Sequence, residues 1–140
     1  MPTSAKQVIS TPGAPKAIGP YSQGVAVPAP GPGGLPVTLL FVSGQIPLDP
    51  KTGELVRGTI EAETRRVMEN LAAVLLAGGG GFQHVVKTTI YLTDLADFTK
   101  VNEVYGGYFP ADPPARATVQ VAALPRGARV EIEAVAALGR

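Results

Sequence analysis

The chain has 140 residues, of which 45% are hydrophobic, and it carries a formal net charge of +1. This length and apolar content predict a single folded domain, residues 1–140, with one hydrophobic core. The absence of cysteine excludes disulfides and thiolate nucleophiles, and no basic run is present to form a nucleic-acid-binding surface.

The N-terminal segment MPTSAKQVIS lacks the apolar run of a signal peptide, and no stretch of the chain approaches the length of a membrane span. We therefore expect a soluble, cytoplasmic protein without membrane contacts. The 14 prolines and 17 glycines form no repeat, but they gather in clusters that divide the chain into structural elements.

The first half of the chain predicts a β-hairpin followed by a helix. Gly24–Val27 and Thr38–Ser43 have the composition of short strands, and Pro28–Pro36 joins them as a long, stiff loop. Pro47–Gly53 is a turn segment because it contains Asp-Pro and Thr-Gly pairs. Thr59–Ala77 is predicted to be a helix, with apolar residues at helical spacing, acidic residues in its first turn and a glycine after its end.

The second half adds a strand, a helix and two strands. Val85–Thr93 is rich in β-branched residues, which favours a strand. Apolar positions at helical spacing predict a helix over Phe98–Tyr108, weakened near its end by two glycines that each cost about 1 kcal/mol relative to alanine. Ala115–Ala122 and Arg129–Ala136 are the last predicted strands.

The order β-β-α-β-α-β-β indicates an α+β fold, a mixed sheet with two helices packed on one of its faces. The other face of the sheet, lined by small apolar residues, needs a cover. Oligomerisation is the simplest cover.

Several kinds of catalytic site are excluded. His84 is the only histidine, so neither a serine triad nor a histidine-based metal cluster can be built. The glycine clusters Gly31–Gly34 and Gly78–Gly81 do not open helices, so neither fits a phosphate-binding loop. We expect no metal and no cofactor, which leaves Arg, Glu, Tyr, Ser and backbone groups for any chemistry.

The segment Pro114–Ala136 carries Arg116 in one predicted strand and Glu131 in the next. An arginine among small apolar residues suggests a site for a small anionic metabolite, since a guanidinium can bind a carboxylate through two hydrogen bonds. The alternative is an ordinary solvated edge arginine beside a half-exposed strand.

Four segments in consistent order resemble one known family. They are IGPYSQG at Ile18–Gly24, FVSGQIPLDPKTGE at Phe41–Glu54, VVKTTIYLTDLADFTKVNEVY at Val85–Tyr105, and PARATVQVAALPRGARVEIEAVA at Pro114–Ala136. Together they resemble the RidA/YjgF family of reactive-intermediate deaminases, over about residues 17–137. The departure from the family pattern is the Pro28–Pro36 loop, which is longer than the family's usual tight hairpin.

The resemblance implies a chorismate-mutase-like α+β subunit that assembles into homotrimers with clefts at the subunit interfaces. It implies hydrolysis of 2-imino acids and their enamine tautomers, such as 2-iminobutyrate and 2-aminoacrylate, to 2-keto acids and ammonia. The expected partners are small 2-imino and 2-keto acids and further copies of the chain, without nucleic acid. The arginine that matches Arg116 marks the branches of the family that are active deaminases.

The resemblance also assigns catalytic roles. Arg116 would hold the substrate carboxylate, Glu131 would contact the imine nitrogen or position the attacking water, and the Tyr21 hydroxyl would contact the nitrogen or the water. Without the resemblance, Tyr21 is better explained as a turn aromatic packed on the core.

Four further residues would bind the substrate. Ser43 and the backbone of Gly44 would line the pocket, and Ser43 would assist protonation of the enamine. Asn102 matches another pocket position, and a backbone group of Thr118 would contact the ligand. The alternatives are a turn residue for Ser43 and a polar surface position on a helix for Asn102.

One difficulty concerns the two charged residues. In a tight hairpin centred near Arg126, Arg116 would lie opposite Val135 or Ala136, well over 10 Å from Glu131 at about 3.3 Å per residue. If both contact one small ligand, the last two strands are not a simple hairpin, or the ligand lies between layers.

Three functional hypotheses remain: a 2-imino-acid deaminase, a non-catalytic trimer that binds small keto acids, and an RNA-cleaving enzyme. The near-neutral charge and the lack of a basic stripe argue against the third.

Overall fold

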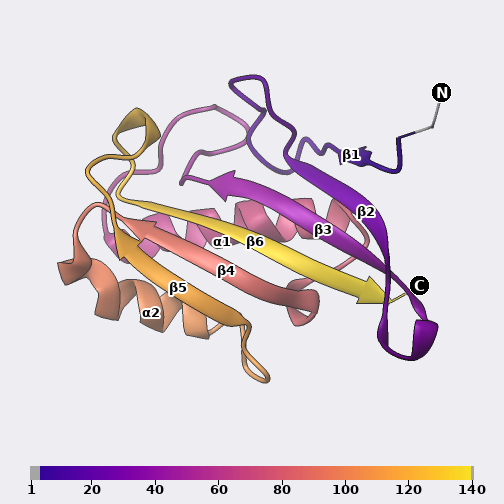
Figure 1. Cartoon of the computed structure of the whole chain (residues 1–140). Coiled ribbons are helices and arrows are strands. Elements are labelled where there is room, and N and C mark those ends of the chain that lie inside the picture. Colours follow the sequence, from indigo (N-terminus) through magenta and orange to yellow (C-terminus); the bar gives the residue numbers. More distant parts are fainter. Residues whose placement is uncertain (1–3, 140) are drawn as a thin grey trace.

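The structure is a computed structural model that describes residues 4–139. One sheet has the strand order β1-β2-β3-β6-β4-β5. Its strands are β1 (Gln7–Ile9), β2 (Gly24–Pro30), β3 (Pro36–Gln45), β4 (Val85–Leu92), β5 (Ala115–Gln120) and β6 (Val130–Gly139). Helices α1 (Ile60–Ala77) and α2 (Phe98–Gly106) lie on one face of this sheet (Figure 1), which confirms the predicted α+β fold.

The long helix α1 has the ends that its sequence predicts. The Thr59 side chain accepts a hydrogen bond from the Ala62 N–H, Glu61 and Glu63 occupy the first turn, and Gly78 caps the C-terminus. The helix buries its apolar stripe against β3, β4 and β6, which contribute buried residues such as Leu40, Ile90 and Ile132. Each such side chain contributes about 1.5–3 kcal/mol on burial, so the main core lies between sheet and helices.

The second helix is shorter than predicted. It ends at Gly106 and is capped by Gly107, so the prediction that it continues to Tyr108 is wrong. An added Cβ at Gly106 would contact nothing within 4 Å, so close packing does not explain this glycine. The two glycines end the helix.

The hairpin between β2 and β3 is more regular than predicted. Its strands stay paired as far as Pro30 and Pro36, so the predicted long loop at Pro28–Pro36 is wrong and the tip is only Gly31–Leu35. The short strand β1, which was not predicted, pairs only with Gly24–Ala26. Beyond Ala26, β2 is therefore an edge strand, where proline is tolerated.

The last two strands are not a hairpin. β5 pairs with β4 in parallel, whereas β6 is inserted between β3 and β4 and is antiparallel to both. The connection from β5 to β6 passes through a short turn at Pro125–Gly127, in which Arg126 has a left-handed φ of 61°. β5 is consequently an edge strand and β6 a central one.

The second face of the sheet is apolar and is covered by neither helix (Figure 1). Val25, Phe41 and Val135 lie side by side across β2, β3 and β6 on this face. Phe41 is 45% exposed, and its two neighbours are partly exposed. No helix among residues 4–139 is long and apolar enough to cross a membrane.

We predict that two leucines of α1 contribute very differently to stability. Leu71 is 1% exposed and Leu76 is 75% exposed. Leu71→Ala should lower the free energy of unfolding by about 2–5 kcal/mol, whereas the matched control Leu76→Ala should change it by about 0.5 kcal/mol or less. Urea unfolding at one fixed protein concentration measures both, and equal losses would contradict the position of the core.

Candidate functional site

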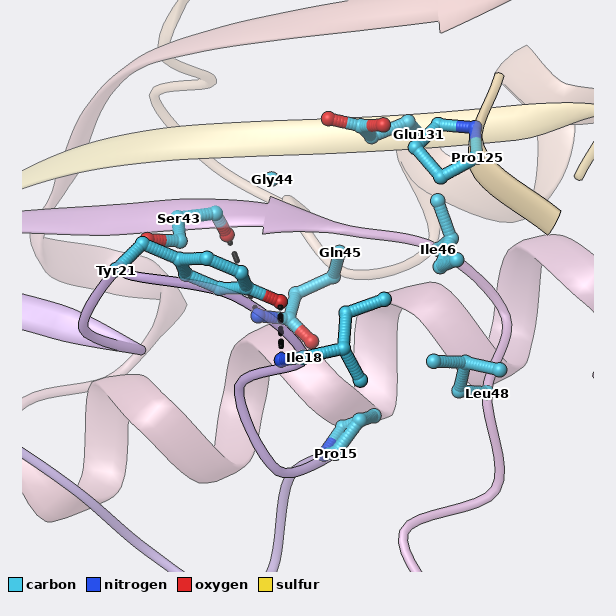
Figure 2. A pocket seen from close by; sticks show the side chains of 10 residues that line it. All are labelled: Pro15, Ile18, Tyr21, Ser43, Gly44, Gln45, Ile46, Leu48, Pro125 and Glu131. Atoms are coloured by element: carbon cyan, nitrogen blue, oxygen red, sulfur yellow. Dashed lines mark hydrogen bonds between the residues drawn. The ribbon is translucent and has the colours of Figure 1, made fainter. Parts of the chain in front are cut away.

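A cavity of about 440 Å³ lies where the loop before β2 meets the end of β3 and the start of β6 (Figure 2). Its polar side chains come from Tyr21, Ser43 and Glu131, with the Gly44 backbone between them. The remaining lining is mostly apolar and consists of Pro15, Ile18, Gln45, Ile46, Leu48 and Pro125. Four of the residues predicted for the site therefore line one cavity.

Gly44 lies close to the Glu131 carboxylate, and this closeness favours glycine at position 44. The pairing of β3 with β6 shifts register between Val42 and Gln45, which places Gly44 beside the carboxylate. A Cβ added to Gly44 would lie 2.9 Å from the Glu131 carboxyl carbon, closer than real contacts allow. A larger residue at this bulge would therefore force the Glu131 side chain to move, and glycine lets the carboxylate keep its position.

The environment of Glu131 makes it a weaker acid than usual. Burial raises the pKa of Glu131, and the negative charge of Glu133 on the same face of β6 raises it further. The Tyr91 hydroxyl donates a 2.5 Å hydrogen bond to Glu133. Among residues 4–139 no cation forms an ion pair with Glu131. The acid is thus suited to exchanging a proton with a ligand.

The two hydroxyls of the cavity differ in whether their protons are available to a ligand. The Tyr21 hydroxyl accepts a 3.3 Å hydrogen bond from the Ile18 N–H, which leaves its own proton for a ligand (Figure 2). The Ser43 hydroxyl donates to the Ser22 carbonyl oxygen at 2.5 Å. Because its proton is already engaged, Ser43 offers a ligand only its lone pairs in this arrangement. This geometry does not favour the predicted protonation of an enamine by Ser43.

Arg116 lies in a different environment, against α2. Its guanidinium donates a 2.6 Å hydrogen bond to the Asn102 Oδ1. Its central carbon lies 5.6 Å from the Phe98 ring centre and 5.1 Å from that of Tyr105. The aromatic rings and the amide hold the cation in place and leave other guanidinium donors for an anion.

Thr118 follows Arg116 on the same face of β5. Its Oγ1 is buried and, within the part of the chain that the structure describes, is the buried side-chain atom without a hydrogen-bond partner. An unpaired buried hydroxyl costs free energy, and because this oxygen is shielded from solvent it is not open to a ligand in this arrangement. Among residues 4–139 no group of three or more acidic or histidine side chains could hold a metal ion.

Comparisons with known proteins decide the family. The sequence profile of the family described as Endoribonuclease L-PSP matches residues 11–138. The chain is 49% identical to 2-iminobutanoate/2-iminopropanoate deaminase of Mus musculus, over 99% of this chain and 96% of that protein. The chain belongs to the RidA/YjgF family. The family indicated by the four ordered segments is thus confirmed.

Two further RidA/YjgF relatives show how far the similarity extends. Protein DfrA of Myxococcus xanthus is 60% identical over 94% of this chain and 95% of its own length. The crystal structure of E. coli TdcF with bound serine is 40% identical, has a TM-score of 0.81, and is matched over 96% of this chain and 98% of that one.

Within one RidA/YjgF chain, the predicted site residues fall into two separate sets. Arg116 is level with Thr88 on β4, whereas Glu131 is level with Tyr91, three residues further along and two strands away. Arg116 faces the helices, and Glu131 faces the opposite side of the sheet. The first set is Tyr21, Ser43, Gly44 and Glu131, and the second is Arg116, Asn102 and Thr118. A single copy of the chain therefore does not bring Arg116 and Glu131 together.

The apolar wall of the cavity was not predicted. Ile46 immediately precedes the predicted turn segment Pro47–Gly53 and Leu48 lies within it, yet both are buried. The available signal was the pair of large apolar residues, Ile46 and Leu48, on either side of Pro47. Exposure of both to water in a surface turn would be unfavourable, so the pair indicates burial.

We predict that Glu131 reduces stability at neutral pH. Its raised pKa means that the unfolded chain loses this proton first, so the stability it contributes at low pH is lost as pH rises through the folded pKa. Glu131→Gln should therefore increase the free energy of unfolding at pH 7 and leave it nearly unchanged at pH 4. Urea unfolding at both pH values measures this, with the exposed Glu103→Gln as control. A loss of stability at pH 7 would contradict the prediction.

Proposed function

We propose that this protein is a 2-iminobutanoate/2-iminopropanoate deaminase, which hydrolyses 2-imino acids and 2-enamino acids to 2-keto acids and ammonia. The proposal rests chiefly on Arg116, a guanidinium held by an amide and two aromatic rings with donors left for a carboxylate. The name of the mouse relative and the serine bound to TdcF support small substrates of the amino-acid type.

We further propose that the working enzyme is a homotrimer in which each site spans two subunits. The two sets of site residues are separated within one chain, but Arg116 lies on the edge strand β5, where a neighbouring subunit can approach. The apolar face around Phe41 would be covered in such an assembly, which removes exposed apolar surface from water. Arg116 of one subunit would then face the cavity of the next.

The proposed reaction needs little assistance, because imines hydrolyse in water without a catalyst. Arg116 binds the substrate carboxylate and fixes the position of the imine carbon. Glu131 takes a proton from the attacking water as its oxygen bonds to that carbon. That proton passes to the nitrogen, which gives a carbinolamine. The hydroxyl proton then moves to the nitrogen as the C–N bond breaks, so that ammonia and a 2-keto acid are released. The Tyr21 hydroxyl donates to the water or to the nitrogen.

We predict that Arg116→Ala lowers kcat/KM about 100-fold, since it removes a charge-assisted, two-point contact with the substrate. The imine is generated by threonine dehydratase, and keto-acid release is followed while a competing amine traps the imine. The exposed Arg65→Ala is the matched control and should behave as the unaltered protein. If the unaltered protein gives no acceleration, the deaminase proposal fails.

The same protein samples separate the other two hypotheses. Binding of 2-oxobutanoate that depends on Arg116, without turnover, would establish a non-catalytic keto-acid-binding protein. RNA cleavage that survives repeated purification would favour the ribonuclease activity named in the family description.

We predict that two inactive variants restore activity when they assemble together. Arg116→Ala keeps Glu131, and Glu131→Gln keeps Arg116, so a mixed trimer contains some interfaces with both intact residues. Each mixed trimer has one such interface out of three, so trimers that carry both tags should show about one third of full activity. Differently tagged subunits, co-expressed and purified through both tags, allow the measurement. Mixed trimers with no activity would place both residues in a site within one chain.

A further inference from the structure

The apolar wall of the cavity is irregular backbone that needs support from outside the sheet. After Gln45 the chain leaves β3, and Ile46 and Leu48 turn inward beside Ala128 in a small second core. The segment has one isolated bridge, between Leu48 and Leu55, rather than a strand partner. The carbonyls of Ile46 and Pro47 accept from the N–H groups of Leu48 and Val56, whereas the Leu48 carbonyl oxygen depends on a side-chain donor. Such a donor is important because an unpaired buried polar group is costly.

Asn70 supplies this donor. It lies in the middle of α1 and is fully buried. Its Nδ2 donates to the Ile46 carbonyl oxygen at 3.2 Å and to the Leu48 carbonyl oxygen at 2.9 Å. Each amide hydrogen thus meets one carbonyl of the cavity wall, which joins the wall to the helix behind it.

A second contact fixes the orientation of this amide. The Arg66 Nε donates to the Asn70 Oδ1 at 3.1 Å, one helical turn away, and Arg66 also pairs with Glu69 at 3.0 Å. Because a guanidinium can only donate, the oxygen of the amide must face Arg66 and the nitrogen must face the wall. All of the donor and acceptor groups of the buried amide are therefore used.

We propose that Asn70 is a positioning residue that fixes the Ile46–Leu48 wall and thereby determines which substrate side chains the site accepts. This inference rests on the proposed deaminase function. With the carboxylate on Arg116 and the reacting carbon beside Glu131, a substrate side chain extends toward the apolar lining of the cavity. A methyl group is too short to depend on the wall, whereas a branched side chain packs against it.

The test compares two substrates in one variant. Asn70→Asp keeps the shape and the oxygen that faces Arg66, but it turns a second oxygen toward two carbonyl oxygens and so repels the wall. An amino-acid oxidase generates the imines of alanine and leucine. KM for the leucine-derived imine should rise about tenfold, while KM for the alanine-derived imine and both kcat values should change about twofold or less.

Two further variants separate positioning from general stability. Thr64→Val removes another buried hydrogen bond of α1, from the Thr64 hydroxyl to the Ile60 carbonyl oxygen, away from the cavity. It should lower stability without changing the ratio of the two KM values. Arg66→Met frees the amide to rotate, and it also breaks the ion pair with Glu69 on the helix surface. It should shift the ratio in the same direction as Asn70→Asp, but less. An unchanged ratio in Asn70→Asp, or an equal shift in Thr64→Val, would overturn the inference.

Two readouts do not require turnover. Binding of pyruvate and of 4-methyl-2-oxopentanoate, measured by calorimetry, should show the same loss of preference for the larger ligand. Amide exchange at Leu48 and Val56, which donate to the carbonyls of Ile46 and Pro47, should accelerate in Asn70→Asp. If the unaltered protein hydrolyses no imine, the deaminase proposal fails while these readouts decide the role of Asn70. If it hydrolyses imines and neither readout moves, only the inference about Asn70 fails.

Discussion

The position of β6 between β3 and β4 is the constraint on which the rest of the structure depends. Side chains alternate across a strand, so Val130 and Ile132 enter the core against the helices while Glu131 must face the other side of the sheet. The same insertion moves β5 to the edge and carries Arg116 with it. The insertion of β6 thus places Glu131 at the centre of the open face and Arg116 at the edge of the sheet, on the opposite side.

The open face of the sheet carries both apolar side chains and partly buried acids. The two kinds of residue have opposite effects on an isolated chain. Phe41 and its neighbours favour association, since removal of their surface from water is stabilising. Burial and the negative charge of Glu133 both make ionisation of Glu131 more costly, and they raise its pKa. A carboxylate kept in such surroundings without a paired cation has no stabilising role within its own chain, and this is the physical argument for a role toward a ligand.

Local signals in the sequence predicted local structure well. The helix α1 and the strand β4 were predicted closely because capping residues, helical spacing and β-branched runs are short-range features. The strand β1 was missed because three residues show no periodicity, and the tip of the β2–β3 hairpin was misjudged because proline is tolerated on an edge strand. The place of β6 could not be predicted, since it depends on pairing between distant segments.

The grouping of Tyr21, Ser43, Gly44 and Glu131 came from family resemblance. Asn70 gave no signal, because the partners that connect it to the cavity wall are backbone carbonyls.

The division of the site between two faces of one chain links assembly to chemistry. In the proposed trimer, the contact that covers the apolar face also brings a carboxylate-binding arginine to a cavity that otherwise has none. In a single subunit, the Arg116 guanidinium donates to the Asn102 side chain and lies on the opposite side of the sheet from Glu131. Glu131 lies in the same subunit beside the apolar wall of the cavity, and the described residues that line this cavity include no arginine. Each half has its own support within one chain, because Arg116 contacts α2 and the wall accepts hydrogen bonds from Asn70 of α1. The orientation of the substrate is then set by how the subunits pack and requires no movement within either half.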